Sequence, residues 1–154
     1  CAFADGPVEY INSPDEVSYT EVDFNPKFKD NLFFVHLGKK QSTAQGIKDY
    51  LKAVKNKATL VKAITKITEE IRSVTNLKDF EALLSKHEDL IASHTGFSKV
   101  KEQLFSDYSG VVKSLGACGG DFVLATSDKG DDATKEYFTG KGYPTVLKYK
   151  DIIL

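Results

Sequence analysis

The stretch V-V-K-S-L-G-A-C-G-G-D-F-V-L-A-T, residues 111–126, decides the fold, because it places small residues between two apolar, strand-like segments. Glycine permits a positive φ and lets another group approach the backbone closely. Several N–H groups of such a loop can point to one centre and bind an anion. The candidate anion site consists of Gly116, Ala117, Cys118, Gly119 and Gly120. A tight turn between neighbouring strands is the simpler alternative.

Residues 122–126 read F-V-L-A-T, and they are apolar on both sides of an extended chain. This pattern predicts a strand that is covered on both faces. The phosphate-loop pattern G-x-x-x-x-G-K-[ST] and the dinucleotide pattern G-x-G-x-x-G do not occur.

The composition is that of one soluble globular domain. The 154 residues are enough for a real core, and hydrophobic and charged residues make up 41% and 28%. The net charge of −1 gives no electrostatic case for nucleic acid or an anionic membrane as partner. No apolar run reaches the roughly 20 residues that span a bilayer.

The two cysteines, Cys1 and Cys118, do not form a disulfide framework. We expect Cys118 to be a free thiol, which fits a reducing compartment and a cytoplasmic protein. Residues 2–4 continue from Cys1 as if within a strand. We therefore expect Cys1 to lie inside a longer chain, rather than at the start of a lipoprotein.

Short strands separated by turns are predicted for the first part of the chain. Turn signals at Asp5–Pro7 and Asn12–Asp15, with alternation over residues 17–24, indicate a β-meander of two or three strands. The apolar run N-L-F-F-V-H-L, residues 31–37, predicts a central strand.

Four helices are predicted next. The first begins at Ser42, which has capping-box spacing to Gln45, and ends near Asn56. Its expected buried stripe is Ala44, Ile47, Leu51 and Val54. The second carries the apolar stripe Leu60, Ala63, Ile64, Ile67, Ile71 and Val74. The third is capped by Asn76, with Asp79 in its first turn. The fourth begins near Ser98 and uses Val100, Leu104, Phe105 and Tyr108.

After the second glycine-flanking strand, Asp131 or Asp132 is expected to cap a last helix that stops at Gly140 or Gly142. Residues 145–149 predict a closing strand. This element order favours an α+β fold, with an antiparallel sheet and helices packed on one of its faces.

A second candidate site follows the central strand. The segment Gly38–Thr43 leads from a strand into a helix N-terminus, where free N–H groups and the helix dipole favour anions. Its candidate substrate-binding residues are Lys39, Lys40, Ser42 and Thr43. The alternative is an ordinary capped connection with two solvated lysines.

His87 lies on the apolar stripe of the third helix, so it is either a cleft residue or a partly buried histidine with one hydrogen-bond partner. The other histidines have no partners at metal-ligand spacing, and no zinc site is expected. Cys118 has no histidine nearby in sequence to activate it as a nucleophile. The acids of residues 128–132 lack the order of an EF-hand loop.

Residues 113–125 resemble the third, C-terminal motif of the GHMP small-molecule kinases, K-x-[ST]-G-A-G-G-G-G-x-[VI]-x-A. The matching positions are Lys113, Gly116, Ala117, Gly119 and Gly120, whereas Cys118 and Asp121 stand where the family has glycine. Residues 35–43 are similar to the T-G-x-x-R-x-[SA] segment of the sugar-kinase members, with Leu37 and Gln41 in place of the Thr and the Arg. In relatives this segment faces the phosphoryl acceptor.

Residues 86–91, K-H-E-D-L-I, resemble the N-H-x-L-L helix of the family, which implies that His87 lines the cleft. Residues 23–29, 32–35, 38–42 and 105–110 resemble a bacterial branch labelled mevalonate kinase-like or GHMP kinase. The resemblance implies that residues 1–154 form the ferredoxin-like C-terminal domain of such a kinase, with inserted helices.

The implied enzyme transfers the γ-phosphoryl group of ATP, with Mg²⁺, to a hydroxyl or phosphate of a small metabolite. The family's ATP-phosphate loop, P-x-x-x-G-L-G-S-S-A, and the catalytic acid that belongs with it occur nowhere in the sequence. We therefore expect an N-terminal ATP-binding half as partner. This chain alone is expected to hold no catalytic residue, to bind no cofactor and to be inactive. The alternative is a stand-alone, non-catalytic α+β binding or regulatory module.

Overall fold

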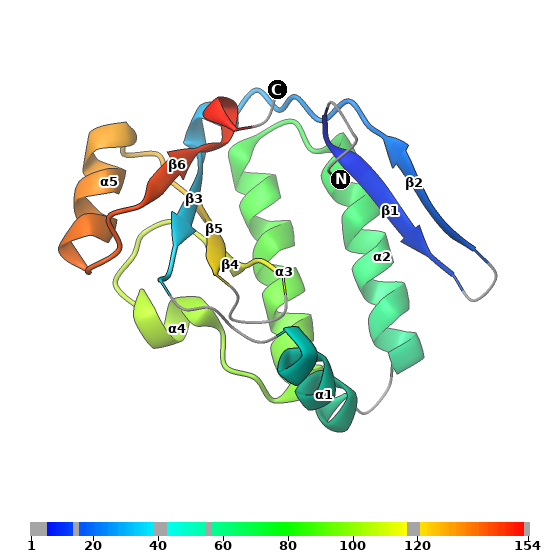
Figure 1. The fold of residues 1–154 in the computed structure, drawn as a ribbon. Coiled ribbons are helices and arrows are strands. Elements are labelled where there is room, and N and C mark those ends of the chain that lie inside the picture. Colours follow the sequence, from blue (N-terminus) through cyan, green and yellow to red (C-terminus); the bar gives the residue numbers. More distant parts are fainter. Residues whose placement is uncertain (1–5, 14–15, 39–42, 55–56, 117–120, 153–154) are drawn as a thin grey trace.

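The structure is a computed structural model that describes residues 6–13, 16–38, 43–54, 57–116 and 121–152. Within these ranges it contains two antiparallel sheets and five α-helices (Figure 1). The smaller sheet is a hairpin of β1 (Val8–Asn12) and β2 (Val17–Glu21), which confirms the predicted meander in its two-stranded form. The strand expected over residues 2–4 lies outside the described residues.

The larger sheet has four strands in the order β4-β5-β3-β6. Their bounds are β3 Leu32–His36, β4 Val112–Ser114, β5 Phe122–Thr126 and β6 Val146–Lys148. All three pairings are antiparallel, and β3 is an inner strand as the apolar run 31–37 predicts. Short 3-10 turns, Lys29–Asn31 and Tyr149–Asp151, precede β3 and follow β6.

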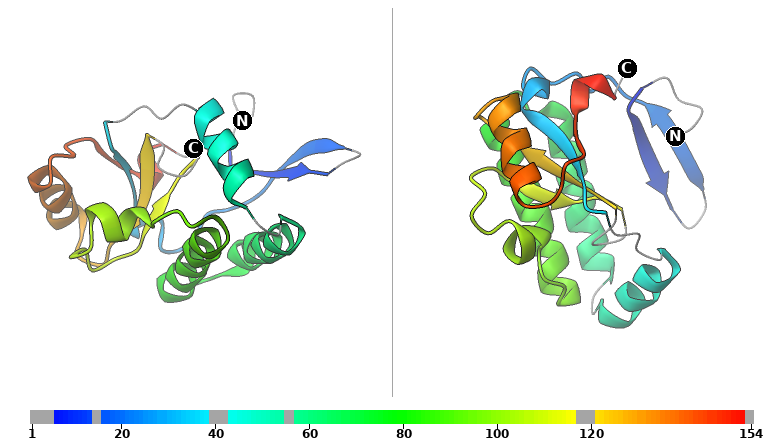
Figure 2. Two further views of the ribbon diagram at one scale, coloured as in Figure 1. Left: turned by 90° about the horizontal axis from the view of Figure 1, so that it is seen from below. Right: turned by 60° about the vertical axis from the view of Figure 1, so that its left-hand side comes forward.

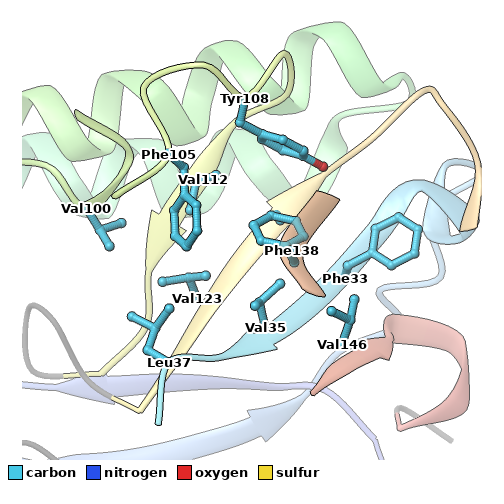
Figure 3. Close-up of a cluster of buried hydrophobic side chains, with 11 residues drawn as sticks. Phe33, Val35, Leu37, Val100, Phe105, Tyr108, Val112, Val123, Phe138 and Val146 are labelled. Carbon is cyan, nitrogen blue, oxygen red and sulfur yellow. The ribbon is translucent and has the colours of Figure 1, made fainter. Parts of the chain in front are cut away.

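One face of this sheet is covered by α4 (Val100–Leu104) and α5 (Asp131–Gly140). The core there is built from alternate strand residues such as Phe33 and Val35, which pack with Phe105 and Phe138 (Figure 3). The rings of Phe105 and Phe138 meet edge to face, with centroids 5.2 Å apart. Such a geometry is favourable for aromatic pairs.

The opposite face is covered by α3 (Leu77–Thr95), which lies beside α2 (Lys57–Ser73). Leu32 packs there with Phe80 and Leu84 of α3. Successive strand residues point to opposite faces, so Leu32 and Phe33 enter different cores. We expected helices on one face, but the structure divides them between both. The antiparallel α+β architecture itself is confirmed.

The N-terminus of α3 is formed as its sequence predicts. The Asn76 side chain accepts a hydrogen bond from the Asp79 N–H at 2.9 Å, and Asp79 lies in the first turn. Gly96 ends the helix in the left-handed conformation, with φ of 74°. This is a common glycine C-terminus.

The helix α1 (Thr43–Ala53) forms where it was predicted, but its apolar stripe is not buried. Ile47 and Leu51 are 52% and 59% exposed. The hairpin projects from the body of the molecule (Figure 2), and its Tyr10, Val17 and Tyr19 are more than half exposed. An exposed apolar surface of this kind marks an interaction site when its members are contiguous.

Two helix ends differ from expectation. Gly130, at φ of 84°, takes the cap position of α5, so Asp131 and Asp132 lie inside the first turn and neither caps the helix. Their carboxylates still interact favourably with the positive end of the helix dipole.

The fourth helix is shorter than expected, because α4 ends at Leu104. The buried Phe105 and Tyr108 follow it in a turn, in which the Tyr108 N–H donates to the Phe105 carbonyl. No helix in the described ranges is long and apolar enough to cross a bilayer.

Candidate functional site

The two candidate loops leave the large sheet at the same end. The N–H of Leu37, which follows β3, donates to the carbonyl of Asp121, which precedes β5, at 2.7 Å. His36 pairs with Phe122 across the same two strands, and their rings lie 4.9 Å apart. The segment that begins at Gly38 therefore starts beside the segment that ends at Asp121.

The glycine run joins two neighbouring antiparallel strands, β4 and β5. Its first residue, Gly116, has φ of 69°, and a Cβ there would meet no heavy atom within 4 Å. The loop thus has the topology of the simpler turn, and its entrance is open enough for a ligand to approach the backbone. Ala117, Cys118, Gly119 and Gly120 lie outside the described residues.

A pocket of ≈ 540 Å³ lies beside this entrance, between α3, α4 and the end of β4. Gly116 and His87, which are 29 positions apart in sequence, both line it. One part of its wall is apolar and includes Leu37, Ile91, Val100, Leu104 and Tyr143. The polar residues beside β4 are His87, Glu88, Lys113 and Ser114, and further polar side chains line the pocket on the side of α4. An apolar pocket with a few convergent polar groups is the usual form of a small-molecule site.

Glu88 is the buried charge of this pocket, with 7% of its surface exposed. Its Oε1 lies 3.6 Å from Nζ of Lys113 and 3.7 Å from Nδ1 of His87, and its Oε2 accepts from the N–H of Ser114 at 3.4 Å. Burial raises the pKa of Glu88, but His87, the Lys113 charge and the Ser114 N–H together bring the pKa below its usual value. The carboxylate is therefore ionised at neutral pH.

His87 is less exposed than a solvated surface histidine, and its side chain keeps 21% of its accessible surface. Its Nδ1 is buried and makes no hydrogen bond to any described residue. The Nδ1 atom lies close to Oε1 of Glu88, so the histidine and the buried carboxylate face each other. The expectation of a partly buried histidine with one hydrogen-bond partner stays a prediction.

The structure brings together Gly116 and His87, two of the residues that the sequence singled out. Lys39, Lys40 and Ser42 lie outside the described residues, and for Thr43 only the backbone at the start of α1 is described. Sequence reasoning missed Glu88. A charged residue four positions after Leu84, on a stripe that otherwise enters the core, was the signal that could have found it.

The polar residues of the pocket can hold an anion but do not form a metal centre. No group of three or more His, Cys, Asp or Glu side chains in the described part of the chain could hold a metal ion. Lys113 lies next to the glycine run and its side chain is 17% exposed. Lysine side chains and backbone N–H groups are donors that phosphate-binding sites use.

No protein-family model matches the chain, and no curated protein matches it. Among solved structures, the chain is similar to mevalonate kinase of L. major, determined in complex with R-mevalonate, with a TM-score of 0.61 and 17% sequence identity. The match covers 88% of this chain and 44% of that one. At this identity the likeness shows the fold alone. The chain thus has the fold of part of a mevalonate kinase, and it spans less than half the length of that protein.

Proposed function

We propose that this chain is the C-terminal, substrate-side domain of an ATP-dependent small-molecule kinase of the GHMP type. The complete enzyme transfers the γ-phosphoryl group of ATP to a hydroxyl or phosphate of a small metabolite. The observation that carries the proposal is the likeness to mevalonate kinase over 88% of the chain, together with the glycine run between β4 and β5. This run carries the residues that resemble the third motif of the family.

The missing part of such an enzyme is an N-terminal ATP-binding half. The similar mevalonate kinase is more than twice as long as the part that this chain matches, since the match covers 44% of it. The hairpin and α1 leave apolar side chains uncovered, and surfaces between domains resemble protein–protein interfaces. The members of this uncovered set are Tyr10, Ile11, Val17, Tyr19, Ile47 and Leu51. We infer that the N-terminal half packs against some of them.

Within the proposed enzyme, the amides that begin at Gly116 bind a phosphate group, and the Lys113 ammonium group, paired with Glu88, lies beside them. His87 forms part of the wall of the acceptor pocket, together with the segment of Lys39, Lys40, Ser42 and Thr43. Bound ATP and Mg²⁺ supply the phosphoryl group and neutralise its charge. The residues named here position the reactants, and we assign no acid–base catalyst to this chain.

The remaining parts of the proposal concern partners and location. The partners are the N-terminal half and a small-molecule substrate, with no nucleic acid and no membrane. We propose a cytoplasmic location, which suits Cys118 as a free thiol. The net charge of −1 agrees with the absence of a polyanionic partner.

A pair of glycine variants tests the phosphate role of the loop. Gly116 and Gly142 have φ of 69° and 89°, and a Cβ at either position meets nothing within 4 Å. Gly116→Ala and Gly142→Ala should therefore each lose about 1–2 kcal/mol of unfolding free energy from the left-handed conformation alone. Only Gly116→Ala should also lower kcat/KM for ATP, by about tenfold or more, because its methyl group would crowd a phosphate group that approaches the backbone.

The measurement is phosphoryl transfer from γ-labelled ATP by the gene product that contains this chain. R-mevalonate belongs in a panel of metabolites that carry hydroxyl or phosphate groups. Equal turnover in the two variants, at equal stability, would mean that the glycine run is only a turn between two strands and has no role in phosphate binding.

A further inference from the structure

We infer that Glu88 is a positioning residue that holds the end of β4 in place at the point where the glycine run begins. The idea that the glycine run binds a ligand rests on the proposed function, whereas the contact between Glu88 and β4 does not. The inference starts from the place of β4 in the sheet. This strand is at the edge, since the order is β4-β5-β3-β6.

An edge strand has alternate N–H groups that no neighbouring strand satisfies. The N–H groups of the two residues next to Ser114 point toward the neighbouring strand β5. The Leu115 N–H, for example, donates to the Phe122 carbonyl at 3.2 Å. The N–H of Ser114 points the other way and donates to Oε2 of Glu88. The buried carboxylate of Glu88 thus accepts the hydrogen bond that a neighbouring strand would accept from an inner strand.

A second carboxylate of α3 acts at the other end of β4. Glu81 accepts from the hydroxyl of Thr126, and the same hydroxyl oxygen accepts from the N–H of Val111. Glu81 and Glu88 are seven residues apart, which is about 10.5 Å along a helix. Val111 and Ser114 are three residues apart, which is about 10 Å along a strand. The two spacings agree. Glu88 contacts the end of β4 directly, whereas Glu81 reaches the residue before β4 through the Thr126 hydroxyl of β5.

The two ends of β4 connect to different parts of the molecule. The start of β4 leads back into the core around Thr126, which is fully buried. The end leads through Leu115 to Gly116 and into the glycine run. Glu88 also contacts Lys113, whose Nζ donates to the Ser114 carbonyl at 2.9 Å. One side chain therefore fixes both the amide and, through Lys113, the carbonyl of Ser114, close to the start of the loop.

The charge of Glu88 does not oppose an anion at the loop. The carboxylate faces Lys113 and His87, and with Lys113 it forms a neutral pair. An incoming phosphate group would meet this pair and the loop amides rather than an isolated negative charge. This arrangement explains how a carboxylate can serve beside an anion site without repelling the ligand.

The test compares Glu88→Leu with Glu81→Leu. Leucine is similar in size to glutamate and leaves no acceptor. It also removes a charge partner of Lys113, so Glu88→Leu is expected to lower the stability of the chain. In amide hydrogen exchange on the chain itself, Glu88→Leu should speed exchange at Ser114 and at its neighbour Leu115 about tenfold or more. Glu81→Leu should leave both amides unchanged. Glu88→Gln restores an acceptor and should recover part of the protection.

The functional arm uses the gene product that transfers phosphate. Glu88→Leu should raise KM for ATP about tenfold while kcat changes less, and Glu81→Leu should leave both near the original values. Unchanged exchange at Ser114 in Glu88→Leu, or no recovery in Glu88→Gln, overturns the positioning role. Faster exchange with an unchanged KM overturns the link to the phosphate loop. Absence of transfer in the original protein counts against the proposed function only, because the exchange arm still decides the role of Glu88.

Discussion

Gly110→Ala should lower the unfolding free energy of the chain by at least about 3 kcal/mol, the upper part of the range for overpacked interiors. A Cβ at Gly110 would lie 2.0 Å from the backbone oxygen of Thr126 and 3.0 Å from Cε1 of Tyr108. Contacts this short cannot be relieved by rotating a flexible side chain, since the nearest atom belongs to the backbone. The substitution has to displace β5 or the entrance to β4.

The surroundings of Thr126 leave little room for such a shift. Its carbonyl accepts from the Tyr108 hydroxyl at 2.9 Å, and its N–H donates to the Val111 carbonyl at 2.9 Å. Moving it would break buried hydrogen bonds, which costs more than their net contribution to folding. The effect should reach the candidate site, because β4 and β5 carry the glycine run.

The matched control is Gly140→Ala. Gly140 lies in the last turn of α5, and a Cβ there meets nothing within 4 Å. Alanine in a helix is favoured over glycine by roughly 0.5–1 kcal/mol, so this variant should be neutral or slightly more stable. Urea unfolding of both variants gives the comparison. Similar midpoints for the two would mean that Gly110 does not approach β5 as described.

Leu60→Ala and Leu51→Ala should lower the unfolding free energy of the chain by very different amounts, although the substitution is the same. Leu60 of α2 is 2% exposed and Leu51 of α1 is 59% exposed. Truncating a buried leucine costs about 2–5 kcal/mol, from lost transfer free energy and the cavity left behind. At an exposed position the same change is usually within about 0.5 kcal/mol.

This pair is informative because the sequence predicts both leucines to lie on buried helical stripes. The midpoints of urea unfolding of the chain alone, measured at one pH, show whether each leucine is buried. A loss at Leu51 as large as that at Leu60 would show that α1 packs its apolar side against the rest of this chain. The expected small loss instead leaves that side free for another surface.

Local signals predicted most of the elements. The run 31–37 predicted β3, the alternation after Glu16 predicted β2, and Asn76 with Asp79 marked the start of α3. Each of these depends on a few neighbouring residues, through strand propensity or a side-chain cap. The last helix also ends at Gly140, one of its two predicted ends.

Features that depend on distant contacts were not predictable in this way. A three-four stripe shows that a helix is amphipathic, but it does not show what covers the stripe, and α1 leaves Ile47 and Leu51 exposed. The division of helices between two sheet faces depends on which helix reaches which strand. The cap of α5 was misplaced because Gly130 can adopt φ of 84°, a conformation that glycine takes without a steric penalty.

The candidate site was predicted in the same partial way. The glycine run and His87 were visible as local patterns, and the structure places Gly116 and His87 at one pocket. Glu88 was hidden because its partners, Lys113 and Ser114, lie 25 and 26 positions away in the sequence. Only the packing of α3 along β4 brings these groups together.

The most direct test of the central claim is phosphoryl transfer by the complete product of the gene that encodes this chain. The reaction would contain γ-labelled ATP, Mg²⁺ and the metabolite panel with R-mevalonate, and labelled small molecules would be separated and counted. We expect a labelled product, formed by a protein that carries P-x-x-x-G-L-G-S-S-A together with this chain, and none from the 154-residue chain alone. A complete product that lacks this motif and labels nothing would contradict the kinase assignment and favour a non-catalytic module.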